Sequence, residues 1–392
     1  MTTDVNSLRK TIVIASVIFW LVATGGWLYT TKSANYSWDS ISYAALIGGP
    51  ASETSEARHD RAFAEFGRVV TPEQYGTQIN FSPYTRLMAT NTQQFDSQLP
   101  MYKVKAGYIA AGRVISGWVP PFRALRLINV IALVLLSSAG LWWMVKGGFV
   151  QASFAIVPAL GLAGITDALS LSTPDILESA VLLLAVAALR TGRIMVGALI
   201  FAAATYVRPD AIFLGLGCWV AALMLGHQLK TASLVLAGSA AGYAAATLGV
   251  GYPGWWYHVS MALYGADAAL HPVPFTLFGY IAKVGSRALG ILLLNGWASF
   301  VCLAGILWIA LTPKRNLVSS GTVIFFGAFL SLGGRLLGFP MTENRIYLPT
   351  LIIMTFLVAE RWQPDLAPAL SAMWSGRPSW LKRRRFDYET AD

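Results

Sequence analysis

The chain has 392 residues, of which 55% are hydrophobic and only 12% are charged, and its mean hydropathy is +0.56. About a quarter of the residues of an ordinary soluble domain are charged, so this composition excludes that class and indicates a membrane protein with several spans. The net charge of +10 does not indicate nucleic acid, because the basic residues form short clusters between apolar runs, a pattern that sets membrane orientation.

The N-terminal part predicts one membrane helix followed by a long polar loop. A short segment at 1–10 precedes an apolar run at 11–31, which is long enough to cross a bilayer. No small-residue cleavage site follows, so we expect an uncleaved helix with a cytoplasmic N-terminus. The loop at 32–121 is then exported. Helical spacing in 53–66 and a proline-led helix start at Thr71 predict short helices on the membrane surface.

The segment 101–118 is apolar enough to span, but it carries Lys103, Lys105 and Arg113 and three glycines. If it is a juxtamembrane helix, most basic clusters fall on the cytoplasmic side, whereas counting it as a span places them outside. We therefore expect an all-α bundle of about ten transmembrane helices in the inner (plasma) membrane, with both termini cytoplasmic. The nine spans within 122–361 are expected at 122–145, 149–166, 175–190, 194–207, 210–228, 231–250, 288–311, 318–338 and 346–360. A basic cytoplasmic tail at 362–392, which includes the run from Lys382 to Arg385, completes the prediction.

In this topology, the charged and titratable residues that are costly in lipid gather on the exported side. Such residues are usually retained because they face a cavity or one another. One polar cavity open to the exterior is the simplest interpretation. The residues are Asp39, Arg86, Lys103, Lys105, Asp167, Asp175, Arg208, Asp210, His258, His271, Glu343 and Arg345.

Several of these residues also have a purely structural interpretation. Thr173-Pro174-Asp175 fits a helix start, and Arg208-Pro209-Asp210 fits a tight turn between two spans. Exported turns disfavour basic residues, however, so Arg208 indicates a phosphate partner. The lysines at 103 and 105 fit snorkelling side chains, and their spacing of two points them to different sides of a helix, so at most one faces the cavity.

Metal and redox chemistry receive little support from the sequence. His258 and His271 lie in an aromatic-rich loop without a nearby carboxylate pair, which is a weak metal signal. The two cysteines, Cys218 and Cys302, both lie in apolar runs and indicate neither a disulfide nor a redox centre.

Five short motifs occur in order along nearly the whole chain. An early exported aspartate, Asp39, is followed by the segment 98–105 (Gln-Leu-Pro-Met-Tyr-Lys-Val-Lys), by Thr173-Pro174-Asp175, by Arg208-Pro209-Asp210 and by the segment 345–349 (Arg-Ile-Tyr-Leu-Pro). Their joint occurrence resembles the GT-C glycosyltransferases, a class that includes protein mannosyltransferases, the aminoarabinose transferases of lipid A and bacterial lipopolysaccharide sugar transferases.

The resemblance implies a reaction and roles for residues. Enzymes of this class transfer a sugar from a polyprenyl phosphate, usually with inversion, on the periplasmic face. Asp39 matches the general base that activates the acceptor hydroxyl. The residues expected to bind the donor phosphate are Lys103, Lys105, Arg208 and Arg345. The residues expected to line the cavity are Tyr102, Asp175, Asp210, Arg86, His258 and Glu343.

The chain also departs from parts of the family. Protein mannosyltransferases usually place two acids together, whereas Asp39 is followed by Ser40. Oligosaccharyltransferases add a large soluble C-terminal domain and use a divalent metal, whereas only about thirty residues follow the last expected span, which makes a metal doubtful here. No cofactor is expected. The partners expected are a polyprenyl-phosphate-linked sugar, membrane lipid and an envelope glycan, lipid or protein.

The sequence leaves several alternatives open. The sugar, the acceptor and the choice between a monophosphate and a diphosphate donor are not determined. A transporter or lipid flippase is the main competing class, although no inverted repeat is evident and the first loop is long. A non-enzymatic scaffold leaves the clustering of charge on one side unexplained.

Overall fold

The computed structural model describes residues 5–32, 35–50, 52–264, 268, 271, 273–294, 296–311, 319–341 and 343–362. Within these ranges the chain is helical and has no β-strand; an isolated parallel bridge joins Asn35 and Leu171. The α-helices are α1 (Val5–Thr30), α2 (Trp38–Ile47), α3 (Ser55–Val69), α4 (Pro72–Ile79), α5 (Pro83–Thr90), α6 (Thr92–Lys103), α7 (Ala106–Ser116), α8 (Pro121–Gly147), α9 (Ser153–Leu162), α10 (Ile165–Ser170), α11 (Asp175–Arg190), α12 (Ile194–Val207), α13 (Ile212–Leu225), α14 (Leu229–Thr247), α15 (Trp255–Tyr264), α16 (Leu277–Leu294), α17 (Gly296–Leu311), α18 (Ser320–Gly338) and α19 (Leu348–Trp362). Short 3₁₀ turns at Val150–Ala152 (η1), Pro209–Ala211 (η2) and Asn344–Ile346 (η5) connect some of them.

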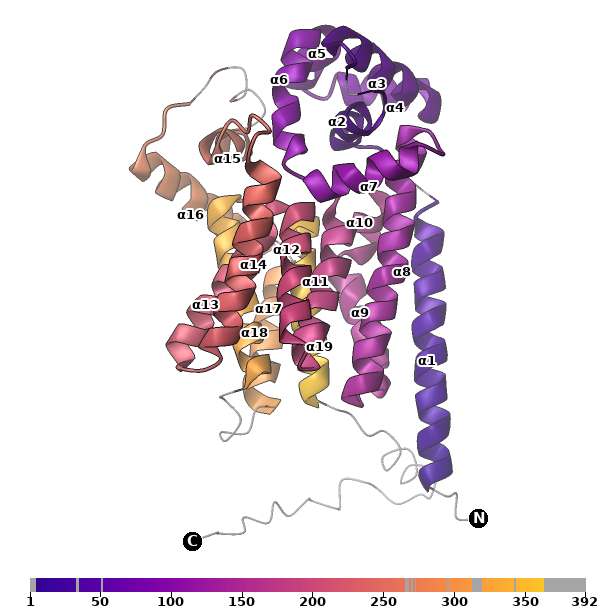
Figure 1. Cartoon of the computed structure of the whole chain (residues 1–392), viewed down its shortest axis with the longest axis vertical. Coiled ribbons are helices and arrows are strands. Elements are labelled where there is room, and N and C mark those ends of the chain that lie inside the picture. The colour runs from indigo at the N-terminus through magenta and orange to yellow at the C-terminus, as the bar shows by residue number, and fades with distance from the viewer. Residues whose placement is uncertain are drawn as a thin grey trace.

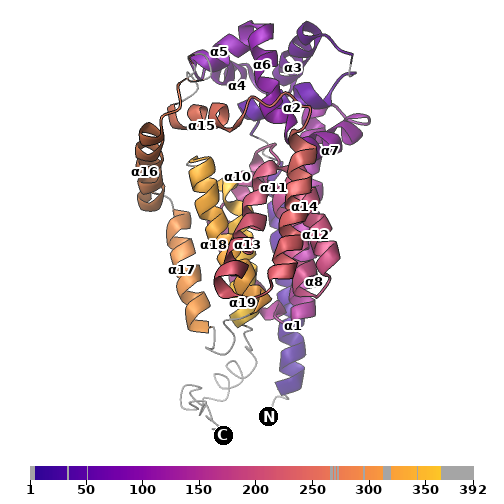
Figure 2. The ribbon, with the colours of Figure 1, turned by 60° about the vertical axis from the view of Figure 1, so that its left-hand side comes forward.

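The molecule has two parts (Figure 1). The long helices run side by side as a bundle, and α2 to α7 gather over one end of it. We call α2 to α7 (38–116) the capping domain, and the bundle end beneath it the capped end. From the second direction, α15 also lies across the capped end, with α16 and α17 at the edge of the bundle (Figure 2).

The bundle contains helices suited to a membrane. Three helices are long and apolar enough to cross one, at Asn6–Thr30, Pro121–Gly147 and Ser320–Gly338. Shorter apolar helices occupy Val150–Leu162, Ile194–Val207, Pro209–Leu225 and Ser299–Leu311. These helices indicate a membrane protein, as the composition predicted.

Helix α11 forms the centre of the bundle and packs against α8, α12 and α19. Nearly all of its side chains are buried. Two of the tightest contacts elsewhere in the bundle depend on glycine. A Cβ atom at Gly217 in α13 would collide with the backbone of Gly327 in α18, and a Cβ at Gly242 in α14 would collide with the backbone of Ala202 in α12. Small residues thus let these helix pairs approach closely, as is common in membrane bundles.

The capping domain is built from short helices whose starts the sequence specifies. Thr71 and Ser82 each precede a proline at the first helical position, and each forms a capping box with the residue three places on. The helix expected at 53–66 is present as α3, and the helix start expected at Thr71 is that of α4. Isolated helices this short are marginal, so a shared apolar core stabilises them. That core includes Ile41, Phe66, Phe95, Leu99 and Tyr108.

Three expected helices differ from the observed ones. The segment 101–118 is not one helix, because α6 ends at Lys103 and α7 begins at Ala106. The span expected at 149–166 is interrupted at Gly164, whose φ of 88° is readily adopted by glycine. The span expected at 288–311 corresponds to the end of α16 and all of α17, with residue 295 between them outside the described ranges. The basic turn at 314–315 and the tail at 363–392 are also outside those ranges.

Candidate functional site

A cavity lies where the capping domain meets the capped end of the bundle. We call it the interface cavity. It has a volume of about 280 Å³ and draws its lining from α2, α6, α11, α15 and the loop before α19. Its lining residues are Asp39, Tyr43, Met101, Tyr102, Lys105, Pro174, Asp175, Arg208, His258, Met261, Phe339, Met341, Glu343, Arg345 and Ile346.

Asp39 lies in the first turn of α2, where the positive end of the helix dipole favours a carboxylate. The Tyr102 hydroxyl donates a hydrogen bond to Asp39 Oδ1 at 3.1 Å. Arg345 pairs with the other oxygen, Oδ2, at 3.0 Å. The Asp39 side chain is still 30% exposed, so an incoming group can reach it. A held but accessible carboxylate is the arrangement that a general base requires.

Arg345 lies among three carboxylates. Besides Asp39, it pairs with Glu343 at 2.5 Å and with Asp175 at 3.5 Å. Burial alone would lower the pKa of Arg345, but Asp175 and the other two acids outweigh it and hold that pKa well above its usual range. Arg345 is therefore always charged, and an anion that binds it has to displace a carboxylate.

A second arginine continues the alternation of charges into the bundle. Arg208 pairs with Asp175 and, at 2.8 Å, with Asp210. Glu178, one turn along α11 from Asp175, pairs with Arg335 of α18. Glu178 and Arg335 are only 0% and 1% exposed, so each needs opposite charges beside it; Arg335 also pairs with Asp210 at 3.2 Å. The buried end of the network therefore fixes the helices that carry its accessible end.

Lys105 contributes a cation that titrates in an accessible range. It occupies the N-cap position of α7, and its ammonium group donates to the carbonyl oxygen of Met101 at 2.5 Å. The same nitrogen lies 5.5 Å from the centre of the Tyr102 ring. Burial, and secondarily the charge of Arg208, lower the pKa of Lys105 to about 8. A bound anion would favour the charged form.

A smaller, mostly apolar cavity of about 170 Å³ adjoins the interface cavity. The two share Lys105, Arg208, His258 and Phe339 in their linings. His258 Nδ1 lies 2.9 Å from the Tyr252 hydroxyl, and burial holds the pKa of His258 well below its usual range, so the ring is neutral. The apolar side of this smaller cavity comes from Ile212, Phe213, Tyr243, Trp255 and Phe339. A charged chamber and an apolar one therefore lie next to each other.

The structure brings most of the residues predicted from sequence together. Asp210 lines the smaller cavity and contacts Arg208. The other predicted residues found in the interface cavity are Asp39, Tyr102, Lys105, Asp175, Arg208, His258, Glu343 and Arg345.

Four predicted residues lie elsewhere. Arg86 is exposed on α5 and donates to the Asn80 side chain at 3.2 Å. Asp167 and His271 are exposed and do not line the cavity. Lys103 lines a different pocket, with Arg58 and Arg113. The spacing of two between Lys103 and Lys105 predicted that at most one would face the cavity, and the structure assigns that place to Lys105.

Sequence reasoning missed Glu178 and Arg335. Each is an isolated charge inside an apolar run, and that is itself a signal for a buried partner. Only the fold could show that the two residues pair across 157 positions of sequence.

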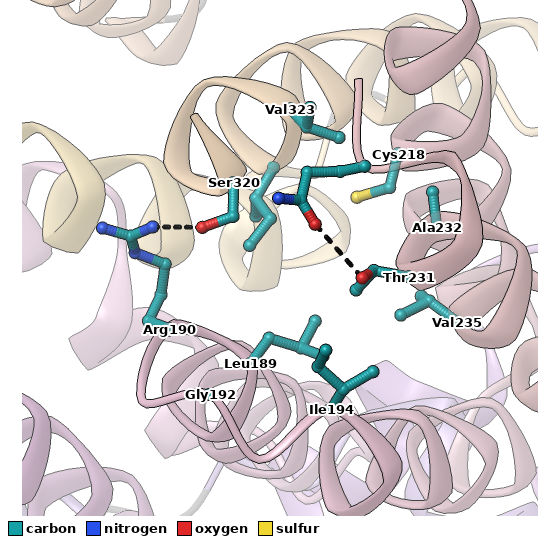
Figure 3. A pocket seen from close by; sticks show the side chains of 12 residues that line it. Leu189, Arg190, Gly192, Ile194, Cys218, Thr231, Ala232, Val235, Ser320 and Val323 are labelled. Atoms are coloured by element: carbon teal, nitrogen blue, oxygen red, sulfur yellow. Dashed lines mark hydrogen bonds between the residues drawn. The ribbon is translucent and has the colours of Figure 1, made fainter. Parts of the chain in front are cut away.

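A pocket of about 250 Å³ lies at the other end of the bundle, where α11 ends at Arg190 and α18 begins at Ser320, and we call it the opposite-end pocket. Its lining side chains are drawn in Figure 3. Arg190 is the charged residue in its lining, and it donates to Ser320 at 2.5 Å and to Glu360 at 2.9 Å. Thr231 donates to the Gln228 side chain at 3.2 Å, and Cys218 lies on the same side of the pocket (Figure 3). Among the described residues, the lining of this pocket includes no carboxylate, and Glu360 already neutralises its arginine, Arg190.

No protein-family model, curated protein or solved structure matches this chain. Among the described residues, no group of three or more His, Cys, Asp or Glu side chains is arranged to hold a metal ion.

Proposed function

We propose that the protein is a membrane glycosyltransferase of the GT-C type, which transfers a sugar from a polyprenyl-phosphate donor to an envelope acceptor. The observation that carries the proposal is the composition of the interface cavity. The same cavity contains an accessible carboxylate, Asp39, and two cations suited to phosphate, Arg345 and Lys105. These are the groups that displacement of a lipid phosphate from a sugar requires.

The topology forms part of the proposal. Ten of the helices cross the inner (plasma) membrane, both termini are cytoplasmic, and the capping domain lies on the exported side. This orientation keeps the basic turns at Lys146, at Arg190 and Arg193, and at Lys230 in the cytoplasm, as the positive-inside rule requires. The interface cavity then opens at the exported surface of the membrane.

The reaction follows from the contacts of Asp39. Its carboxylate takes the proton of an acceptor hydroxyl, whose oxygen forms a bond to the anomeric carbon with inversion. The bond between that carbon and the phosphate oxygen breaks, and its electron pair leaves with the lipid phosphate. Arg345 and Lys105 stabilise the charge that develops on the phosphate, and arginine can bind two of its oxygens at once.

The ion pairs at Arg345 give the reaction an order. Without substrate, Asp39 is held by Arg345 and Tyr102 at 3.0 and 3.1 Å. A donor phosphate that binds Arg345 competes with Asp39 for the guanidinium and releases the carboxylate. Donor binding therefore prepares the base for the acceptor, which binds second.

The smaller cavity suits the lipid part of the donor. Its wall of Phe213, Tyr243 and Trp255 is apolar, and it begins at Lys105 and Arg208, which also line the charged chamber. A phosphate between these cations can extend the first isoprene units of its lipid along that wall. Water is excluded from the leaving group on the same side.

A transporter or flippase is the second candidate, and one observation favours it. The alternating charges from Arg345 through Asp175 and Arg208 to Arg335 extend into the bundle, as expected for a polar translocation path. In the transferase, by contrast, the deep charges hold the accessible ones in place. The two candidates differ in whether a covalent bond of the donor is broken.

The test is an assay of purified protein in lipid with a panel of radiolabelled polyprenyl-phosphate sugars and cell-envelope acceptors. Release of polyprenyl phosphate by the wild type, lost in Asp39→Asn and retained in Asp167→Asn, supports the transferase. Asp167→Asn is the control, because Asp167 is an exposed aspartate of α10 that does not line the interface cavity. If every donor stays intact while lipid changes leaflet, the transferase is rejected in favour of the flippase.

A further inference from the structure

We propose that a pocket at the C-terminal end of α2, separate from the interface cavity, binds the phosphate of an anionic lipid headgroup at the membrane surface. The pocket has a volume of about 270 Å³, and Gly48, Glu53, Arg58, Lys103 and Arg113 are among its lining residues. We call it the basic pocket. Asp39 lies at the other end of the same ten-residue helix, about 12 Å from Ile47 at 1.5 Å per residue. The inference does not depend on the proposed sugar transfer.

The charges of the basic pocket do not balance. Arg58 pairs with Asp96 at 2.5 Å, and Arg61 pairs with Glu53 at 2.8 Å. The hydrogen bond from Arg61 lowers the pKa of Glu53, so this carboxylate is ionised and the pairing is complete. Lys103 and Arg113 add two further cations, and neither has a carboxylate partner among the described residues. An anion is the missing partner.

Capping of the C-terminal end of α2 accounts for only some of the cations in and beside the basic pocket. Helices end with unsatisfied carbonyl groups, and cations nearby are favourable. Arg61 donates to the carbonyl oxygens of Ala44, Ala45 and Gly48, and Arg113 donates through Nε to that of Leu46. Ser116 donates to the next carbonyl, that of Ile47. The helix end is thus already satisfied, while the Lys103 ammonium and the two terminal nitrogens of Arg113 remain for a ligand.

The pocket lies at the level of the membrane boundary. A Cβ atom at Gly48 would touch the ring of Pro121, the first residue of the membrane-length helix α8. Val114 and Trp118, beside Arg113 at the end of α7, are 62% and 79% exposed. Exposed apolar and indole side chains next to cations are typical of a segment that rests on lipid headgroups. A lipid phosphate is the anion that such a surface meets at highest concentration.

The experiment is hydrogen exchange of the full chain in lipid nanodiscs. Three preparations are compared: phosphatidylcholine alone, phosphatidylcholine with phosphatidylglycerol, and phosphatidylcholine with added inorganic phosphate. We expect the backbone amides of 45–49 and 103–113 to exchange several-fold more slowly with phosphatidylglycerol than without it. Equal protection by inorganic phosphate identifies a general phosphate site, and protection by phosphatidylglycerol alone identifies a headgroup site.

Matched variants connect the effect to the pocket. Lys103→Gln should lose the protection, Lys103→Arg should keep it, and Arg86→Gln, which removes an exposed cation of α5 that lines none of these pockets, should not change it. Unchanged exchange in α11 checks that each variant is folded. The proposal is overturned if neither anion slows exchange in the wild type, or if Lys103→Gln retains the full protection.

Discussion

The two ends of the bundle hold pockets of similar volume and different chemistry. The interface cavity brings Asp39, Asp175, Glu343 and three cations together, whereas the opposite-end pocket has one arginine, which Glu360 and Ser320 hold. Both sets of contacts are ionic, but the carboxylate at the capped end, Asp39, is 30% exposed, whereas Glu360 at the opposite end is 15% exposed. For chemistry, the number of charges in a pocket therefore matters less than whether one of them can still react.

The largest expected effect separates the two ends by activity. Asp39→Asn removes the proposed base but keeps the shape of the side chain, so we expect the rate of polyprenyl-phosphate release to fall by about 10³-fold or more. Arg190→Gln at the opposite end should change that rate by less than about twofold, although it weakens contacts there. Rates of polyprenyl-phosphate release in lipid provide the measurement. A strong loss in Arg190→Gln with little loss in Asp39→Asn would reverse the comparison.

A second prediction compares the stability of the ion pairs. Glu178→Gln leaves a buried guanidinium only partly compensated, so we expect the free energy of unfolding to fall by about 3 kcal/mol. Glu360→Gln removes the partner of Arg190, and both side chains there are 15–22% exposed, so about 1 kcal/mol is expected. Thermal unfolding in the same lipid compares them. Equal losses would mean that burial does not distinguish the two pairs.

A third prediction separates binding from catalysis within the interface cavity. Arg345→Gln removes a charged contact to the donor phosphate, so we expect donor affinity to fall by about tenfold to a hundredfold. Direct binding of a non-hydrolysable donor analogue measures this, and Arg86→Gln, at an exposed position of α5 outside the cavity, is the control. Unchanged donor affinity in Arg345→Gln would remove this arginine from the phosphate site.

A fourth prediction concerns pH. Lys105 is charged below its pKa of about 8 and loses its proton as the pH rises through that value. The attraction for the donor phosphate is therefore present below pH 8 and lost above it, so kcat/KM should fall several-fold on the alkaline side. Lys105→Arg stays charged and should shift this fall to higher pH. If wild type and variant share one alkaline profile, another group causes it.

The smallest effect is expected at the opposite end. Ser320→Ala removes the hydroxyl that accepts from Arg190, at a cost of about 1 kcal/mol in the free energy of unfolding and with no change in kcat/KM. Chemical unfolding followed by tryptophan fluorescence measures the free energy of unfolding, and polyprenyl-phosphate release measures kcat/KM. A kinetic effect of Ser320→Ala would show that the two ends communicate.

The sequence predicted local features well and long-range pairing poorly. The helix start at Thr71 follows from side-chain capping within three residues, and the apolar runs predict most bundle helices, because both signals are local. The breaks at Gly164 and between Lys103 and Ala106 depend on how the segments pack, and their sequence signals are weak. The charged residues predicted a polar cavity, but the sequence did not show which of these residues form ion pairs with one another. Arg86 and Lys103 have the right charge on the expected side, yet their helices turn them elsewhere.

The ion pair between Asp39 and Arg345 joins residues 306 positions apart. Chains are made from the N-terminus, so the carboxylate leaves the ribosome long before its partner exists. Until the segment between α18 and α19 that carries Arg345 has been made, the acid in the first turn of α2 lacks its guanidinium partner, and the proposed phosphate site cannot form beside it. For the proposed transferase, a nascent or prematurely terminated chain would therefore be inert toward a lipid donor, and biosynthesis itself would delay activity until the C-terminal helix is in place.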